Sequence, residues 1–196
     1  MSLFSISAVT SQVASLQAET PIKHGVSKVK EVEYINSAVA DLGPIFGELQ
    51  MGTLVNFSTD GQWSLHKLLQ YLLAVTGPAH VCIATWSLTE EPVRALLKLH
   101  SKGLLLSMQG LFDHRIVAKS PEAFFLARSF FDRIGFGKSH AKLITIRNDS
   151  WSIAVVGSSN FTRNPRLEAG VLLPFVDSEV FFRQLILTYI DKNPHV

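Results

Sequence analysis

The sequence predicts an α/β protein built on a mixed, largely parallel sheet with helices on both faces. The main observation is that short apolar runs alternate with longer amphipathic stretches from Thr53 to Ile190. Such alternation is typical of strands joined by helical crossovers. The length of 196 residues also suits one domain with a substantial core, and we find no internal repeat or low-complexity segment.

Residues 1–50 read as an accessory helical segment ahead of a domain at 51–196. Two stripes of apolar residues at helical spacing predict two helices there, the second ended by Gly43-Pro44. The stripes are Val9, Val13 and Leu16, and then Val32, Ile35, Val39 and Leu42.

The domain itself is expected to alternate strands with helices. Short apolar runs rich in β-branched residues predict strands, and periodic amphipathic runs predict helices. The expected strands are 53–57, 81–86, 104–109, a hairpin of 142–146 with 151–156, and 169–173. The expected helices are 63–75, 90–100, 121–133 and 178–190.

Two short motifs flank the predicted hairpin. His140 and Lys142 stand two residues apart, so on an extended segment they share one face. An imidazole can attack phosphorus or move a proton near neutral pH, and an ammonium beside it stabilises charge on phosphate oxygens. Ser158 and Asn160 repeat this spacing after Gly157, whose missing side chain lets the backbone approach a ligand. Together these groups suit a tetrahedral phosphoryl centre.

A second His-x-Lys triplet, His100 with Lys102, serves as an internal control. It ends the periodic run 93–99 just before Gly103, where basic side chains suit the helix dipole and glycine supplies a cap. Nothing like Gly-Ser-x-Asn follows it. We therefore assign His100 to a helix end and the chemistry to His140.

The two motifs resemble the signature of the phospholipase D superfamily: His-x-Lys, then Asp, then Gly-Ser-x-Asn. The resemblance spans residues 139–168 and is greatest to the short bacterial nucleases, in which a Glu after the Asn opens the next strand. It implies that His140 attacks phosphorus to form a phosphohistidine while a second histidine protonates the leaving oxygen. The residues implied to hold the nonbridging oxygens are Lys142, Ser158 and Asn160, and the residue implied to orient an imidazole is Glu168.

One position departs from this signature. The Asp of the motif falls at Arg147, and Asp149 follows two residues later. The connection to Gly157 is also longer than in the short nucleases. Because that Asp is usually structural in the family, the departure leaves the catalytic residues in place but predicts a different hairpin turn.

The charge distribution favours a polyanionic substrate. The net charge is only +2, but residues 115–166 hold nine Lys or Arg against three Asp or Glu. We expect substrate binding by Lys138, Ser159, Arg163 and Arg166, which adjoin the motif. The expected partner is nucleic acid, with DNA favoured over RNA.

The sequence favours chemistry without a cofactor. The seven histidines are scattered, and neither Cys-x-x-Cys nor His-Glu-x-x-His occurs, so no metal is expected. The absence of a Gly-rich loop ending in Gly-Lys-Ser/Thr argues against an NTPase. Cys82, the single cysteine, stands in an apolar run and is expected to be a buried, inert thiol.

The leading interpretation is a metal-independent phosphodiesterase of phospholipase D-like type, an endonuclease. One alternative keeps the site but acts on a phospholipid or small phosphodiester. The other is a catalytically weak nucleic-acid-binding subunit of a larger assembly. The intact His140, Lys142 and Asn160 favour catalysis, whereas Arg147 leaves room for the binding subunit.

The resemblance also implies a homodimer. A mechanism with two histidines needs two motif copies, and the chain carries one, so two chains would share one site. The apolar content of 47% is consistent with a buried interface. We expect a cytoplasmic protein without membrane insertion, since no apolar run reaches membrane-spanning length and residues 1–20 lack the features of a signal peptide.

Overall fold

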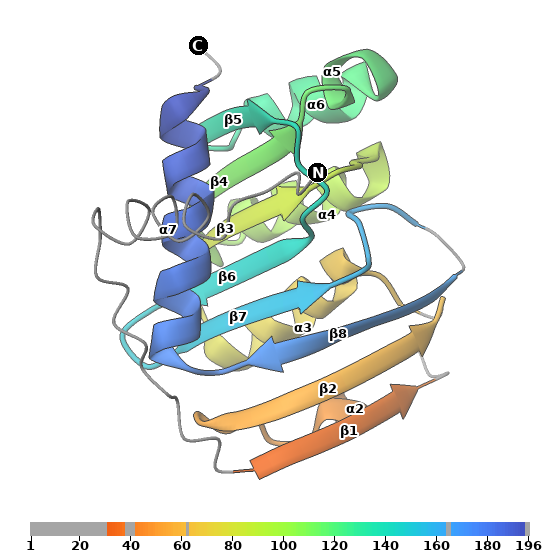
Figure 1. Cartoon of the computed structure of the whole chain (residues 1–196), viewed down its shortest axis with the longest axis vertical. Coiled ribbons are helices and arrows are strands. Elements are labelled where there is room, and N and C mark those ends of the chain that lie inside the picture. The colour runs from red at the N-terminus through yellow and green to blue at the C-terminus, as the bar shows by residue number, and fades with distance from the viewer. Residues whose placement is uncertain (1–30, 38–41, 62, 164–165, 195–196) are drawn as a thin grey trace, which may run out of the picture.

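The computed structural model describes residues 31–37, 42–61, 63–163 and 166–194 (Figure 1). Its strands are β1 (Glu31–Ser37), β2 (Thr53–Asp60), β3 (Ala79–Thr85), β4 (Leu105–Asp113), β5 (Arg133–Gly137), β6 (Leu143–Arg147), β7 (Ser152–Gly157) and β8 (Leu167–Leu173). Its helices are α2 (Gly43–Phe46), α3 (Leu65–Thr76), α4 (Glu90–Ser101), α5 (Ile116–Lys119), α6 (Pro121–Arg128) and α7 (Val176–Lys192).

The strands form one mixed sheet in the order β1-β2-β8-β7-β6-β3-β4-β5. The pairs β1–β2, β3–β4 and β4–β5 are parallel, whereas β2–β8, β8–β7, β7–β6 and β6–β3 are antiparallel. The α/β class is confirmed, but the expectation of a largely parallel sheet is wrong. The short β6–β7 connection permits only a hairpin, and this hairpin with β8 places an antiparallel block between the two parallel ends.

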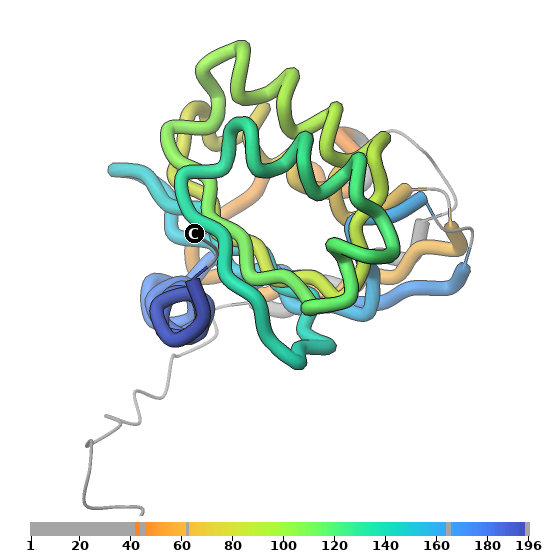
Figure 2. The backbone as a smooth tube through the Cα atoms, turned by 90° about the horizontal axis from the view of Figure 1, so that it is seen from above, coloured from red at the N-terminus to blue at the C-terminus, as the bar shows by residue number. Residues whose placement is uncertain are grey.

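Helices cover both faces of the sheet, as predicted (Figure 2). On one face α3 packs the leucines at positions 65, 68, 69, 72 and 73, which are at most 2% exposed and follow the helical period. On the other face α7 lies across β3 to β7 and buries Ile186 and Ile190 against a smaller cluster that includes Cys82. Burial raises the pKa of the Cys82 thiol to about 11, so this thiol stays protonated at neutral pH.

Neither of the two helices predicted in residues 1–50 is confirmed. The helix predicted from Val9, Val13 and Leu16 lies outside the described residues. The helix predicted from Val32 to Leu42 is wrong over Glu31–Ser37, which form β1 parallel to β2. The segment contains Val, Tyr and Ile, which favour strands, and an open sheet edge supplies the hydrogen-bond partners that decide the outcome. The boundary at residue 50 stays a prediction, although β1 is part of the sheet.

Neither α5 nor β5 was predicted from the sequence, and the predicted helix 121–133 extends past the end of α6. The helix ends at Arg128, and the chain then turns into β5 at Arg133. Gly135 makes this strand possible beside α7, because an added Cβ would lie 2.6 Å from Ile190 Cα. Two glycines in five residues hid this strand from the periodicity analysis.

His66 is expected to make the fold sensitive to acid. Its side chain is 3% exposed, and burial lowers its pKa to about 4, although Glu91 opposes the shift. As the pH falls below about 6.5, His66 of the unfolded chain takes up a proton. His66 of the folded chain stays neutral until about pH 4. Stability should therefore fall as the pH drops through that window, by about 3 kcal/mol.

Urea unfolding at several pH values measures this effect, with His66→Gln as the comparison. The glutamine variant should lose less free energy of unfolding between pH 6.5 and 4 than the parent. The same pH dependence in both proteins would show that His66 is not responsible.

Candidate active site

The residues of both motifs gather at one edge of the sheet. The strands β3, β4, β5 and β7 end there, and β6 and β8 begin there, as their directions in Figure 1 show. The pairings Ala84 with Leu143 and Gly157 with Gly170 align these strand ends. A position outside the carboxyl ends of strands is where α/β sheets bind ligands.

His140 and Lys142 lie in contact just before β6. Lys142 Nζ is 2.8 Å from His140 Nδ1 and donates a hydrogen bond of 2.6 Å to the His140 carbonyl oxygen. The lysine is only 6% exposed, whereas His140 is exposed. Burial lowers the pKa of Lys142, and the charge of Glu168 opposes that shift. The structure thus holds a cation beside an imidazole that solvent can reach.

Ser158 and Glu168 are joined across the start of β8. The Ser158 hydroxyl donates to the Glu168 carboxylate and accepts a 3.1 Å hydrogen bond from the backbone N–H of Ala169. Gly157 serves this strand pairing, because an added Cβ would lie 3.1 Å from the Ala169 carbonyl oxygen. Close packing between β7 and β8 thus favours glycine at this position, and the approach of its backbone to a ligand stays a prediction.

Asn160 lies against Thr85, a residue that was not predicted to belong to the site. Thr85 ends β3, is fully buried, and places its hydroxyl 3.3 Å from Asn160 Oδ1. The same hydroxyl lies 2.8 Å from the Ser87 carbonyl oxygen and 3.4 Å from the Phe161 nitrogen. The sequence feature that could have indicated Thr85 is a hydroxyl side chain at the end of a mostly apolar strand.

Trp86, which follows Thr85, is a second site residue that was not predicted from the sequence. The centroid of its ring lies 5.3 Å from that of the His140 ring. Three cations lie around the same indole, with Arg115 Cζ at 5.0 Å, Lys119 Nζ at 5.5 Å and Lys142 Nζ at 5.9 Å from its centroid. An electron-rich ring among cations helps to hold them near His140.

The residues predicted to bind substrate are less closely joined. Lys138 lines a cavity of about 330 Å³ together with His140. Ser159 is half-buried beside Asn160, and Arg163 and Arg166 are exposed in the connection from β7 to β8. Within the described residues we find no hydrogen bond or ion pair that ties either arginine to the motifs, so their role stays a prediction.

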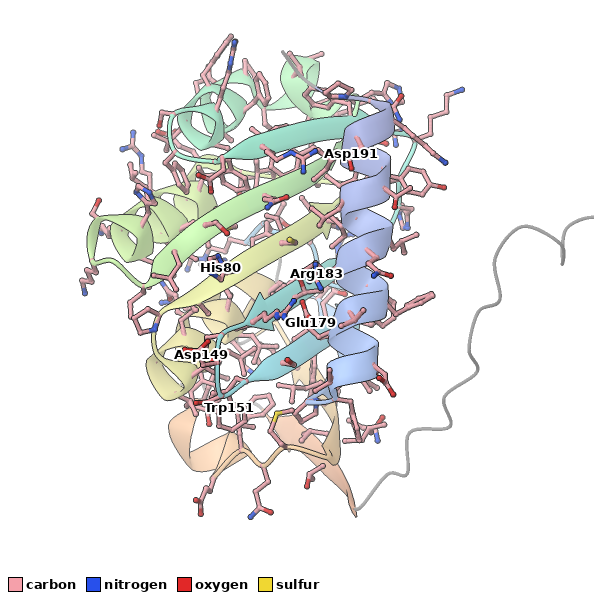
Figure 3. All side chains as sticks on the ribbon, turned by 90° about the vertical axis from the view of Figure 1, so that its left-hand side faces the viewer. His80, Asp149, Trp151, Glu179, Arg183 and Asp191 are labelled. Carbon is pink, nitrogen blue, oxygen red and sulfur yellow. The ribbon has the colours of Figure 1, made fainter. Side chains whose placement is uncertain are left out.

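Arg147, at the position of the motif's Asp, lies at the opposite end of β6 from His140. It pairs with Ser152 and His80, and Figure 3 shows His80, Asp149 and Trp151 at this end of the sheet. The Asn148 side chain fixes the turn, since its Oδ1 accepts from the backbone nitrogens of Ser150 (3.0 Å) and Trp151 (2.9 Å). The sequence predicts a hairpin turn different from that of the short nucleases. In the structure, the Asn148 side chain stabilises this turn through hydrogen bonds to the backbone.

The control triplet behaves as the sequence predicts. His100 lies in the last turn of α4 and is exposed, and its ring centroid lies 5.6 Å from that of Phe130. Its carbonyl oxygen accepts a 2.9 Å hydrogen bond from Gly103, which adopts a φ of 72°. His100 is therefore a helix-end residue.

Two further features bear on function. Among the described residues, no three His, Cys, Asp or Glu side chains are grouped so that they could hold a metal ion. In the same part of the chain, every helix is too short or too polar to cross a membrane.

Comparison with known proteins identifies the fold. No protein-family model and no curated protein sequence matches the chain. Two solved structures are similar over nearly their whole length. Nuc from Salmonella typhimurium, described as a phospholipase D family member, has 18% identity and a TM-score of 0.51, and the match covers 64% of this chain and 90% of that one. NucT from Helicobacter pylori has 15% identity and a TM-score of 0.55, with 73% and 99% covered.

A third solved structure matches through only part of its length. Polyphosphate kinase from Porphyromonas gingivalis has 14% identity and a TM-score of 0.54, and the match covers 73% of this chain but 26% of that one. Identities this low establish the fold alone. The chain has the phospholipase D fold, as its motifs imply.

Proposed function

We propose that the protein is a metal-independent phosphodiesterase, an endonuclease that hydrolyses nucleic-acid phosphodiesters through a phosphohistidine. The observation that carries this proposal is the 2.8 Å contact between Lys142 Nζ and His140 Nδ1. It lies at the sheet edge where Asn160 and the Ser158–Glu168 pair also lie. An imidazole next to cationic and neutral donors can attack phosphorus while its surroundings stabilise the phosphate oxygens.

The proposed reaction has two displacements at phosphorus. His140 Nε2 attacks, a P–N bond forms, and the P–O bond to the leaving group breaks while a second imidazole gives that oxygen a proton. Water then attacks phosphorus, gives its proton to the second imidazole, and breaks the P–N bond. His140 is thereby restored, and no metal or redox partner takes part.

The contact with Lys142 suggests how substrate prepares the nucleophile. When the Lys142 ammonium donates to Nδ1, a neutral His140 ring carries its proton on Nε2. A phosphate oxygen that draws Lys142 toward itself frees Nδ1 to take the proton. The Nε2 lone pair is then available for attack.

The remaining motif residues receive roles in the same scheme. Lys142, Ser158 and Asn160 would hold the nonbridging oxygens, and Glu168 would orient and polarise an imidazole. Thr85 would act as a positioning residue for Asn160, because its buried hydroxyl contacts the Asn160 side chain. Lys138, Ser159, Arg163 and Arg166 would contact the substrate backbone.

We further propose that the working unit is a homodimer that shares one site. The chain carries one His-x-Lys motif joined to Gly-Ser-x-Asn, whereas the reaction uses two imidazoles. A twofold axis near the site would bring both His140 side chains to one phosphate.

For the substrate we propose nucleic acid, with DNA favoured over RNA, because residues 115–166, the stretch that contains His140, Lys142, Ser158 and Asn160, hold an excess of Lys and Arg over Asp and Glu. A phospholipid or small phosphodiester is the second candidate, since the same groups would hold any phosphodiester. A catalytically weak binding subunit remains the third. We propose a cytoplasmic location, where the single free thiol of Cys82 stays reduced.

Hydrolysis in excess EDTA tests this function. Purified protein is incubated with labelled DNA, labelled RNA and bis(p-nitrophenyl) phosphate, with and without the chelator. We expect cleavage at the same rate in both conditions, because the scheme places no metal at the phosphate. Full inhibition by EDTA with rescue by Mg²⁺ would contradict the proposal.

A further inference from the structure

A cavity of about 330 Å³ opens beside His140. Besides His140, its lining consists of Trp86, Asp113, His114, Arg115, Lys138 and Ser139. Most of these residues follow the ends of β3, β4 and β5. The cavity is therefore formed by the same sheet edge as the motifs.

Arg115 is held in a defined orientation in this cavity. Its Nε lies 2.6 Å from Asp113 Oδ1 and its Nη2 lies 3.3 Å from Asp113 Oδ2. Asp113 is only 1% exposed. Burial by itself raises the pKa of its carboxyl, but the hydrogen bonds from Arg115 outweigh burial and hold the pKa below its usual value. The buried carboxylate thus fixes a guanidinium whose side chain is 45% exposed.

The contacts with Asp113 leave part of the guanidinium for a ligand. They use Nε and Nη2, so the N–H donors of Nη1 take no part in the pair with Asp113. A guanidinium oriented in this way can form charge-assisted hydrogen bonds to phosphate oxygens.

Trp86 places Arg115 next to the reaction centre. The Arg115 guanidinium and the His140 ring lie 5.0 and 5.3 Å from the centroid of the same indole. Lys119 Nζ lies 5.5 Å from that centroid, so a second cation reaches this region from α5. Because Arg115 and His140 also line the same cavity, a group bound at Arg115 is a neighbour of a group bound at His140.

The residues in and beside the cavity carry an excess of positive charge, which favours the binding of an anion. Of the described residues that line the cavity, Asp113 alone is acidic, and Arg115 already matches its charge. Lys138 in the lining and Lys119 beside it remain in excess. This anion is distinct from the phosphate under attack, which we assign to Lys142 and Asn160.

We propose that this cavity binds a second phosphate of the substrate, the one adjacent to the phosphate under attack, with Arg115 as its main ligand. The inference rests on the proposed function and specifies its substrate class. The protein prefers chains of successive phosphodiesters over molecules that contain a single phosphodiester.

Substrate discrimination provides the first test. We compare a labelled thymidine oligonucleotide with the p-nitrophenyl ester of thymidine 5′-phosphate, which contains one phosphodiester. In Arg115→Gln, the ratio of kcat/KM for the oligonucleotide to that for the ester should fall about tenfold, mainly through KM, as expected for a lost hydrogen bond to a charged group. Arg94→Gln is the matched control, because Arg94 is also an exposed arginine paired with an acid, Glu90. An unchanged ratio in Arg115→Gln would overturn the inference.

Binding provides a test that does not need turnover. In a His140→Asn background, the logarithm of the association constant for a single-stranded oligonucleotide should depend on the logarithm of salt concentration with a slope smaller by about 0.7 after Arg115→Gln. The Arg94→Gln slope should not change. The same slope in both variants would overturn the inference.

A double variant gives a binding test that leaves the buried Asp113–Arg115 pair unchanged. Lys119→Gln with Lys138→Gln leaves Arg115 and Asp113 intact, and it should lower the same slope even if Arg115→Gln fails to fold.

These experiments distinguish failure of the proposed phosphate site from failure of the proposed function. If the parent cleaves neither substrate but the slopes fall, the proposed function is wrong and the phosphate site stands; if the parent cleaves both and neither ratio nor slope changes, the phosphate site is wrong.

Discussion

Replacing His140 with asparagine should abolish phosphodiester cleavage, with kcat lowered by at least about 10⁴-fold, as expected when a covalent nucleophile is removed. The side chain is exposed, so the substitution leaves the core and the free energy of unfolding nearly unchanged. Oligonucleotide binding, measured by fluorescence anisotropy, should persist. Steady-state assays on DNA and on a chromogenic phosphodiester measure the loss.

His100→Asn is the matched control for this substitution. His100 has the same His-x-Lys context but lies at the end of α4. Its replacement should change kcat by less than about twofold, because surface changes far from the site are nearly neutral. Equal losses from the two variants would contradict the assignment of His140.

Lys142 should contribute in the same assay through the transition state. Lys142→Met keeps much of the buried volume but removes the ammonium that lies 2.8 Å from His140 Nδ1. We expect a loss of about 3–4 kcal/mol in transition-state stabilisation, the size found when one oxyanion donor is removed. Retention of full activity would remove Lys142 from the proposed mechanism.

Mixing His140→Asn chains with unaltered chains should produce heterodimers that are nearly inactive. Each heterodimer holds one His140, whereas the two displacements use a nucleophile and a separate acid. At equal amounts and free exchange, about a quarter of the pairs retain two His140 side chains, so the mixture should keep about a quarter of the parent activity per total chain. Light scattering at the assay concentration should give about twice the chain mass of 21.7 kDa.

A fully active, strictly monomeric protein would contradict the shared site. In that case the second imidazole must come from the same chain, and the structure identifies His114 as the histidine to replace next. It lines the cavity beside His140, and its Nδ1 lies 3.7 Å from the buried Asp113 carboxylate. With the dimer in place, His114→Ala should reduce kcat far less than His140→Asn.

The elements with strong local periodicity could be predicted from the sequence. The leucine stripe of α3 and the apolar run of β3 each carry their own burial pattern, and both form close to the expected residues. Strand direction could not be predicted in this way, because β8 inserts between β2 and β7 through pairings that no local pattern encodes. At β1, the apolar spacing favoured a helix, whereas pairing with β2 decides for a strand.

Some of the site residues could likewise be recognised from local sequence, whereas others are brought together only by the fold. His140 and Lys142 were recognisable because their contact is local, two residues apart. Thr85 contacts Asn160 across 75 positions of sequence, and only the folded sheet brings them together. Trp86 and Arg115 likewise lie on connections after different strands, so the cation cluster around the indole has no signature along the chain.

The stereochemical course of hydrolysis tests the covalent mechanism most directly. A phosphorothioate diester of defined configuration at phosphorus is hydrolysed in ¹⁸O-labelled water with excess EDTA, and the configuration of the product is determined. Each in-line displacement inverts phosphorus, so attack by His140 followed by attack of water predicts net retention. Net inversion would mean that water attacks the substrate directly, and it would contradict the phosphohistidine intermediate at the centre of this account.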